Sequence, residues 1–227
     1  MNIGIVSGKG GTGKTTLATG LARVMNANYV DMDAEEPNGR FFLSPEIKQT
    51  EKSTVMIPKH TDKCTFCGLC AEKCQFSALT IIKKTGKFIL HEDLCHHCGL
   101  CTEICPVEGA LVEDKHVIGE IITGSHSTGG FTEGRLRLSE PSSTPLLEQI
   151  KKRIPGEGLN ILDSSPGASC PVVSVMDTSD YLVLAGEPTP FGLSDLEIVY
   201  KLAMEMGKKT GIVINKYIGN DILHDSA

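Results

Sequence analysis

The 227-residue sequence contains no tryptophan, and only 5% of its residues are aromatic. It has no uninterrupted apolar run near the ~18 residues that indicate a membrane-spanning helix. Positive charge is not in excess either, because the formal net charge is −6 and no basic stripe marks a nucleic-acid surface. No secretory signal precedes the first apolar stretch. These absences predict a cytoplasmic protein with no integral membrane segment and no nucleic-acid partner.

Cysteine, by contrast, is abundant and ordered. Eight of the nine cysteines form two runs with one spacing, C-x2-C-x2-C-x3-C. The first run is Cys64, Cys67, Cys70 and Cys74, and the second is Cys95, Cys98, Cys101 and Cys105, each 31 positions later (64 to 95). In a cytoplasmic chain such clusters indicate metal ligands rather than disulfides.

The two runs resemble the cysteine motif of two-cluster bacterial ferredoxins, in which the fourth cysteine of each run ligates the other cluster. This resemblance implies two [4Fe–4S] clusters. One would take Cys64, Cys67, Cys70 and Cys105, and the other Cys95, Cys98, Cys101 and Cys74. A zinc site is the alternative interpretation, although zinc is normally bound by two separate C-x2-C pairs and not by four cysteines in one C-x2-C-x2-C-x3-C run.

Some details of the cysteine region depart from the ferredoxin motif or leave a choice open. Pro106 follows Cys105 as the motif requires, whereas Gln75 follows Cys74. His96 and His97 lie inside the second run, either as residues that tune a cluster potential or as exposed loop residues. The ninth cysteine, Cys170, is either a ligand at a subunit interface or a small buried side chain.

A phosphate-binding loop opens the chain. It matches G-x-x-x-x-G-K-[ST], follows a predicted strand at 3–7 and begins a predicted helix at 14–26. Its residues are Gly8, Lys9, Gly10, Gly11, Thr12, Gly13, Lys14, Thr15 and Thr16. Backbone N–H groups of such a loop converge on phosphate oxygens, Lys14 is expected at the β- and γ-phosphates, and Thr15 is expected to ligate Mg²⁺. A glycine-rich turn without a ligand explains neither the lysine nor the threonine.

The remaining elements predict an α/β fold: a mainly parallel P-loop NTPase sheet flanked by helices, with an inserted small α+β ferredoxin-like domain. Further strands are predicted at 29–33, 117–122, 159–163, 181–185 and 211–215, helices at 144–153 and 193–206, and an exposed loop at 124–143. The predicted domains are the P-loop ATPase domain at 1–57 and 116–227 and the insert at 58–115. The two halves of the insert are expected to pack about a pseudo-twofold axis.

Lys9, near the start of the phosphate loop, makes the motif typical of a narrower group of proteins. With Lys9 in the sequence KGGTGKTT, the chain resembles the deviant Walker A ATPases, namely the MinD, ParA and Mrp group and the nitrogenase iron protein. The resemblance implies that Lys9 reaches a partner subunit's nucleotide, and a solvated lysine is the alternative. It also implies that Asp33 positions the attacking water beside the catalytic Lys9 and Lys14, that Asp163 holds Mg²⁺ through water, and that Asn215 recognises adenine.

The resemblance implies an ATP-hydrolysing switch that works as a homodimer, or as a heterodimer with a related ATPase. Its cofactors would be ATP or ADP with Mg²⁺ and two [4Fe–4S] clusters, and its target a redox protein or a metalloenzyme. Electron transfer or redox sensing is the first hypothesis, cluster assembly or delivery the second, and a spatial organiser with structural clusters the third. Because chains of this group continue past the strand that bears the asparagine, an abbreviated or truncated end at Ala227 is also expected.

Overall fold

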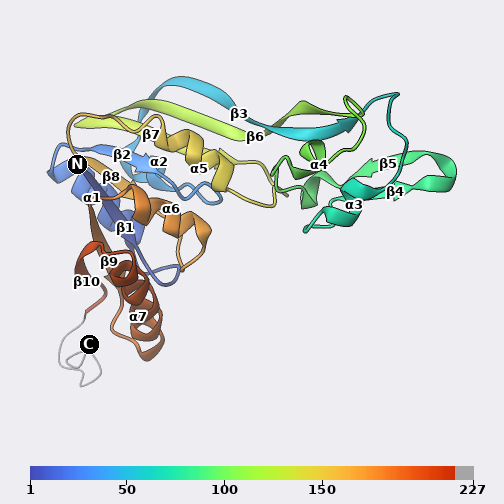
Figure 1. Ribbon diagram of the computed structural model, residues 1–227. Helices are drawn as coiled ribbons and strands as arrows, with labels where there is room; N and C mark the ends of the chain where they lie inside the picture. Colours follow the sequence, from blue (N-terminus) through green and yellow to red (C-terminus); the bar gives the residue numbers. More distant parts are fainter. Residues whose placement is uncertain (218–227) are drawn as a thin grey trace. The chain divides into compact units, whose positions relative to one another are not determined.

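The computed structural model describes residues 1–217 and divides into two compact units (Figure 1). The first unit comprises Met1–Glu51, Glu120–Arg135 and the chain from Thr144 onward. The second unit comprises Lys52–Gly119 and Leu136–Ser143. Within the described residues, no helix has the length and apolar character needed to cross a membrane.

The main sheet has the strand order β10-β9-β1-β8-β2-β7-β6-β3. Its strands are β1 (Asn2–Val6), β2 (Asn28–Asp31), β3 (Glu46–His60), β6 (Leu111–His126), β7 (Gly129–Leu136), β8 (Asn160–Asp163), β9 (Tyr181–Gly186) and β10 (Lys209–Ile214). Strand β1 lies parallel between β8 and β9, and β2 lies parallel between β8 and β7. The prediction of a mainly parallel sheet flanked by helices is therefore confirmed.

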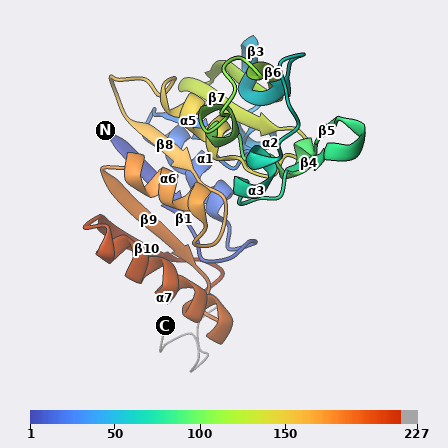
Figure 2. The same cartoon turned by 45° about the vertical axis from the view of Figure 1, so that its right-hand side comes forward.

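Helices cover both faces of this sheet (Figure 2). They are α1 (Lys14–Val24), α2 (Gly39–Leu43), α5 (Thr144–Lys151), α6 (Cys170–Thr178) and α7 (Pro190–Glu205). Because neighbouring strand residues point to opposite faces, Ile5 of β1 packs with Ala18 and Ala22 of α1, whereas Val6 packs with residues of α6 and α7. The phosphate loop follows β1 directly and therefore lies at the carboxyl end of a central strand whose two faces are both covered by helices.

The predicted exposed loop at 124–143 is wrong. Most of it is strand: β6 runs to His126, and β7 pairs with β2 in the interior of the sheet. Phe131 is 1% exposed, and a Cβ at Gly134 would lie 2.2 Å from Cδ1 of Ile150 in α5. The glycines that predicted a loop instead allow helix α5 and neighbouring backbone to approach this strand closely.

The second unit contains the cysteine runs. It holds α3 (Leu69–Lys73), α4 (Leu100–Glu103), the short 3₁₀ turns η1 (Lys83–Thr85) and η2 (Glu92–Leu94), and an antiparallel hairpin of β4 (Leu79–Ile82) and β5 (Lys87–Leu90). Phe66 and His97, 31 positions apart, have φ of 52° and 56°. This shared left-handed conformation shows that the repeat extends from the sequence to the backbone at this turn.

The segment 136–143 also belongs to the second unit, whereas the sequence placed it in the ATPase domain. Its backbone is held by β6, because the Arg137 N–H donates to the Ile118 carbonyl at 2.8 Å. The Arg137 guanidinium donates to the Val117 carbonyl at 2.9 Å. A segment distant from the cysteines in sequence thus completes the unit that carries them.

Candidate functional site

The phosphate loop has a fixed shape. Gly13 has φ of 89°, a left-handed conformation that favours glycine, and it immediately precedes α1. Asn215 Nδ2 donates to the Thr12 carbonyl at 2.8 Å, and a Cβ at position 13 would lie 2.2 Å from that nitrogen. The loop, the start of α1 and the residue after β10 are therefore packed together, and the sequence alone did not predict this role of Asn215.

An open cavity of about 410 Å³ lies over the loop. It is lined by the loop residues from Ser7 to Thr16 except Gly8, and by Asp33, Glu36, Asn38, Phe41, Phe42 and Pro166. Thr12 Oγ1 is buried in the loop and has no hydrogen-bond partner among the described residues. The backbone N–H groups at the start of α1 and this unpartnered hydroxyl fit an anionic ligand.

Lys14 is buried and paired. Its side chain is 7% exposed, and its Nζ lies 2.5 Å from Oδ1 of Asp163, whose side chain is 1% exposed. The predicted phosphate-binding lysine and the predicted Mg²⁺ acid are thus brought together in the first unit. A buried charge without a counter-charge is costly, so each of these two groups stabilises the other in the absence of ligand.

A tyrosine that the sequence analysis missed joins two carboxylates at this site. The Tyr29 hydroxyl lies 2.8 Å from Oδ2 of Asp163 and 3.1 Å from Oδ2 of Asp31. Burial, followed by the charge of Asp163, holds the pKa of Asp31 well above its usual range. The Tyr29 hydroxyl therefore bridges the two carboxylates, and Asp31 also accepts from the backbone N–H groups of Asp33 and Gly39.

The sequence contains part of the information that brings Tyr29, Asp31 and Asp163 together. Tyr29 and Asp31 are two residues apart on one strand and therefore share a face. Asp31 and Asp163 are register partners across β2 and β8. The pairing of these strands had to be known before the three side chains could be assembled.

Asp33, two residues after Asp31, lines the cavity over the phosphate loop. Its backbone N–H donates to Asp31 Oδ1 at 3.1 Å, and its carboxylate side chain is half-buried. Burial raises the pKa of Asp33 to about 6, against the opposing effect of Lys14. The group can therefore exchange a proton near neutral pH, which suits a residue that orients or activates water.

Lys9 is not a freely solvated side chain. Its Nζ forms an ion pair with Oε1 of Glu187, and its side chain is 31% exposed. Oε2 of Glu187 accepts from Lys216 Nζ at 3.0 Å. Hydrogen bonds from Lys9 and then Lys216 lower the pKa of Glu187 to about 2. Within the described chain, the early lysine is therefore held in cis by a glutamate at the end of β9.

A second hollow, of about 380 Å³, also borders Gly13. Its walls are mostly apolar, and Asn215 supplies an amide at one side. The lining residues are Thr12, Gly13, Thr16, Leu17, Gly20, Leu21, Val24, Ala185, Val213 and Asn215. Apolar walls with a single amide can hold a flat, uncharged ring.

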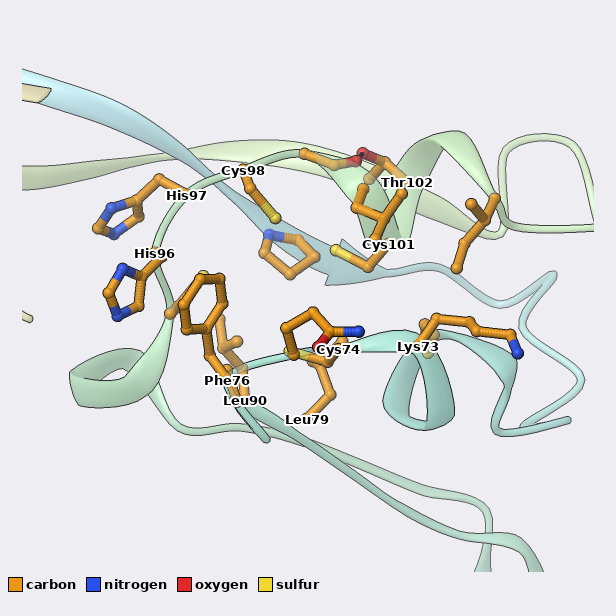
Figure 3. Close-up of a pocket in the computed structure, with 18 of the residues that line it drawn as sticks. Lys73, Cys74, Phe76, Leu79, Leu90, His96, His97, Cys98, Cys101 and Thr102 are labelled. Carbon is orange, nitrogen blue, oxygen red and sulfur yellow. Dashed lines mark hydrogen bonds between the residues drawn. The ribbon is translucent and has the colours of Figure 1, made fainter.

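The eight cysteines of the second unit gather into two groups. Cys64, Cys67, Cys70 and Cys105 line one cavity. Cys74, Cys95, Cys98 and Cys101, together with Cys70, line the other. In Figure 3 the sulfur atoms of Cys98 and Cys101 both turn into this second cavity. Residues from both runs therefore meet at each cavity, as the crossed ligand pattern requires.

The chemistry of these thiols fits a metal cluster. None of the nine cysteines, all of which lie within the described residues, forms a disulfide. Burial raises the pKa of Cys70 and Cys95, and it raises the pKa of Cys101 to about 11. A buried thiol ionises readily only beside a positive charge, and a bound metal supplies one.

Three other residues that the sequence singled out differ from the simplest expectations. Cys170 is exposed at the first position of α6, so the alternative of a small buried side chain is wrong. His96 and His97 are half-buried, so exposed loop histidines are also wrong. The His96 ring stacks on Phe76 with centroids 3.7 Å apart (Figure 3).

Comparison with known proteins gives consistent matches. A family model described as the CobQ/CobB/MinD/ParA nucleotide-binding domain matches residues 3–227. Uncharacterized protein MJ0578 of Methanocaldococcus jannaschii is 36% identical over 207 residues, which cover 86% of this chain and 70% of that protein. Uncharacterized protein MJ0579 of the same organism is 28% identical over 231 residues, covering 98% and 82%.

Solved structures share the fold. The septum site-determining protein MinD of Pyrococcus horikoshii, complexed with Mg-ADP, aligns with a TM-score of 0.56 and 17% identity over 98% of this chain and 72% of that chain. The cell division ATPase MinD of Pyrococcus furiosus aligns with a TM-score of 0.54 and 18% identity over 97% and 73%. At this level of identity the similarity establishes the fold.

Proposed function

The chain belongs to the CobQ/CobB/MinD/ParA family of nucleotide-binding P-loop proteins, and from that membership we propose a switch ATPase coupled to iron–sulfur clusters. In this proposal, ATP binding drives association of two subunits, and the associated pair hydrolyses the ATP. The observation that carries it is the presence, in one chain, of the Lys14–Asp163 phosphate site and of two groups of cysteines that each supply four thiols.

Binding of Mg-ATP rearranges the charges around Lys14. The lysine turns from Asp163 to the β- and γ-phosphates, and Thr15 ligates Mg²⁺. Asp163 would hold that Mg²⁺ through water, and the ion would supply the positive charge that Lys14 gives Asp163 here. This exchange is supported by the short Lys14–Asp163 pair, because neither group loses a counter-charge when the ligand enters.

The nucleotide base occupies the apolar hollow beside Asn215. Leu17, Leu21 and Val213 contact the faces of the ring, and the Asn215 amide recognises its polar edge. Asp33 orients the water that attacks the γ-phosphate, a role supported by its raised pKa and its place in the phosphate cavity. Hydrolysis itself is a transfer of the γ-phosphoryl group to water.

Lys9 acts in trans. In the separate subunit it is held by Glu187, and in the ATP-bound dimer it leaves this partner for the nucleotide of the other subunit. The ion pair with Glu187 thereby holds the Lys9 side chain within its own subunit until association. A trans-supplied cation of this kind can accelerate phosphoryl transfer by ~10³-fold or more.

The cysteine groups hold two [4Fe–4S] clusters, with Cys64, Cys67, Cys70 and Cys105 around one and Cys95, Cys98, Cys101 and Cys74 around the other. Such clusters supply one-electron redox chemistry when bound. The chain passes between the two units at residues 51–52, 119–120, 135–136 and 143–144, so a change in the switch acids can be transmitted through several covalent connections.

The test combines metal analysis with turnover. Anaerobically purified protein should contain about eight iron and eight sulfide per chain. ATP hydrolysis and ATP-dependent dimerisation should then differ between the oxidised and the dithionite-reduced protein, and Cys98→Ser should abolish part of that difference. Protein that holds zinc without sulfide, or clusters whose redox state leaves both measurements unchanged, would refute the coupling.

The dimer is tested by mixing variants. Lys14→Ala should lose nucleotide binding, whereas Lys9→Ala should bind ATP but fail to dimerise or hydrolyse it. Mixed together, the Lys9→Ala subunit binds ATP and the Lys14→Ala subunit supplies Lys9, so activity should partly return. Wild-type turnover by Lys9→Ala alone would contradict action in trans.

One observation favours delivery of clusters as a second candidate function. Cys67 and Cys98, one thiol from each group, are exposed. An exposed ligand can be attacked by a thiol of an acceptor protein, so a cluster held there can be passed on. Transfer of labelled iron to an apo-ferredoxin, faster with ATP than without it, supports delivery. Clusters that cycle between redox states without loss of iron support electron transfer.

A further inference from the structure

Three metal-ligating side chains that play no part in the proposed clusters meet in the second unit. His97 lies in the loop between Cys95 and Cys98, His116 lies on β6, and Glu140 lies in the segment after β7. One ligand atom from each lies within 4.8 Å of the other two. We propose that these residues form a binding site for a single first-row divalent metal ion, of which zinc is the representative.

The burial of the three side chains argues for a ligand. The side chains of His116 and Glu140 are 10% and 6% exposed. Both ring nitrogens of His97 and Oε2 of Glu140 are buried without a hydrogen-bond partner among the described residues. Buried polar atoms normally have partners, and unpartnered ones on neighbouring side chains point to a shared one. A cation would satisfy a nitrogen and a carboxylate oxygen together.

His116 is already oriented for such an ion. Its Nε2 is 2.9 Å from Oε1 of Glu140, and its Nδ1 is 3.6 Å from Oε2 of Glu92. Nε2 binds the metal through its lone pair, so any proton on Nε2 passes to solvent and the remaining ring proton stays on Nδ1. The contact of Nδ1 with Glu92 then fixes the ring, as carboxylates behind ligating histidines commonly do.

The ligand types restrict the metal. Two imidazoles and one carboxylate suit Zn²⁺ and other first-row divalent ions, whereas Ca²⁺ and Mg²⁺ require mainly oxygen ligands. Three protein ligands leave a fourth coordination position for water or a small anion, as in zinc sites that carry out chemistry. The site is therefore expected to accept an exogenous ligand at the metal.

The internal repeat shows that the backbone does not require a histidine at position 97. Its counterpart is Phe66, which precedes Cys67 with nearly the same φ, 52° against 56°. The turn therefore accommodates a phenylalanine as well as an imidazole. His97→Phe follows from the repeat itself, because it keeps a planar ring at a turn that tolerates it and removes a ligand.

The site is also chemically distinct from the cysteine cavities. In Figure 3 His97 lies at one end of the cavity, and the sulfur atoms of Cys98 and Cys101 lie farther inside. Zinc bound by the histidines and the glutamate has nitrogen and oxygen neighbours near ~2.0–2.2 Å, whereas zinc on cysteines has sulfur near ~2.3 Å. The metal's own coordination shell can therefore identify which residues hold it.

The experiment uses the full chain, loaded anaerobically with iron and sulfide and titrated with Zn²⁺ against a competing chelator. Wild type should bind one zinc per chain while keeping its iron, with only nitrogen and oxygen in the first shell by X-ray absorption. His97→Phe and Glu140→Gln should each weaken zinc binding by at least ~10²-fold, since loss of even an outer-shell partner costs ~10–100-fold. His91→Gln, a histidine of the same unit that contacts Thr80, is the matched control and should bind zinc as wild type does.

Sulfur in the zinc shell, or equal zinc affinity in wild type and both ligand variants, would overturn the proposed site. Iron content is measured on the same samples, so a loss of zinc binding can be distinguished from a loss of the iron–sulfur clusters. If the chain holds no iron, zinc with a nitrogen and oxygen shell still supports the site. Glu140→Gln replaces a single heavy atom, whereas His97→Phe is the larger change. If both variants lose zinc, misfolding caused by the change at position 97 cannot explain the loss.

Discussion

Glu187→Gln should tighten the ATP-dependent dimer. In the described chain Glu187 holds Lys9 in cis, and we propose that Lys9 must leave this partner to reach the second subunit's nucleotide. Glutamine keeps the size of the side chain and can still accept hydrogen bonds, but it removes the negative charge. The variant therefore weakens the cis pair without removing any group that faces the nucleotide.

The size of the effect follows from the exposure of the pair. The side chains of Lys9 and Glu187 are 31% and 11% exposed, so water screens the lysine and only partly the glutamate. Ion pairs of exposed side chains contribute ~0.2–1 kcal/mol, and this pair belongs near the upper end. Two lysines, Lys9 and Lys216, lower the pKa of Glu187, so only part of this pKa shift is caused by Lys9. A dimer releases two Lys9 side chains, and about 2 kcal/mol corresponds to a roughly 30-fold lower dissociation constant.

The assay is sedimentation of the variant with an ATP analogue that resists hydrolysis, over a range of protein concentrations. Lys216→Ala is the matched control, because it removes the other lysine on Glu187 and leaves the Lys9 pair intact. The control should dimerise no more tightly than wild type. A dissociation constant for Glu187→Gln equal to or weaker than that of wild type would refute the view that the cis pair opposes association.

Three further predictions follow from the site geometry. The pKa of Asp33, raised from 3.8 to about 6, means that its carboxylate forms as pH rises through about 6, so kcat/KM for ATP should increase over that range and the increase should vanish in Asp33→Asn. Tyr29→Phe removes the hydroxyl that lies 2.8 Å from the buried Asp163 and should lower the free energy of unfolding in urea by ~1.5–3 kcal/mol; an unchanged midpoint would show that the hydroxyl is not needed there. Cys98→Ser should halve the iron content while ATP binding by the first unit persists, and simultaneous loss of nucleotide binding would contradict separately folding units.

The parts of the site that lie close together in the sequence were predictable from it. The phosphate loop is one continuous segment whose glycines, lysine and threonine have fixed spacing, so its position between β1 and α1 could be predicted directly. The alternation of strands and helices likewise predicted the parallel sheet. Each of these signals is local, because the backbone conformation and the ligand groups come from neighbouring residues.

Features that depend on strand pairing or on distant segments were not predictable in the same way. Strand β7 has glycines at 129, 130 and 134, and its hydrophobic pattern is weak, so it looked like a loop until its place between β2 and β6 was known. The contact of Tyr29 with Asp163 requires the register of β2 against β8. Glu140 lay in the predicted loop, and its proximity to His116 depends on the path of the chain after β7.

In the proposed mechanism, the charges of the first unit would separate the response of the phosphate site from that of Lys9. Lys14 is paired with Asp163 on the strand beside β1, and Lys9 is paired with Glu187 at the end of the strand on the other side. Mg²⁺ held with ATP would give Asp163 a positive charge in place of Lys14, so nucleotide binding by one subunit would release only Lys14. Nucleotide binding gives Glu187 no new counter-charge to replace Lys9. Lys216 stays bound to the other carboxylate oxygen of Glu187, however, and this lowers the cost of releasing Lys9. In the proposed dimer, association of two subunits would supply the missing gain, a second nucleotide for each Lys9, so hydrolysis would depend on ATP first and on the partner second.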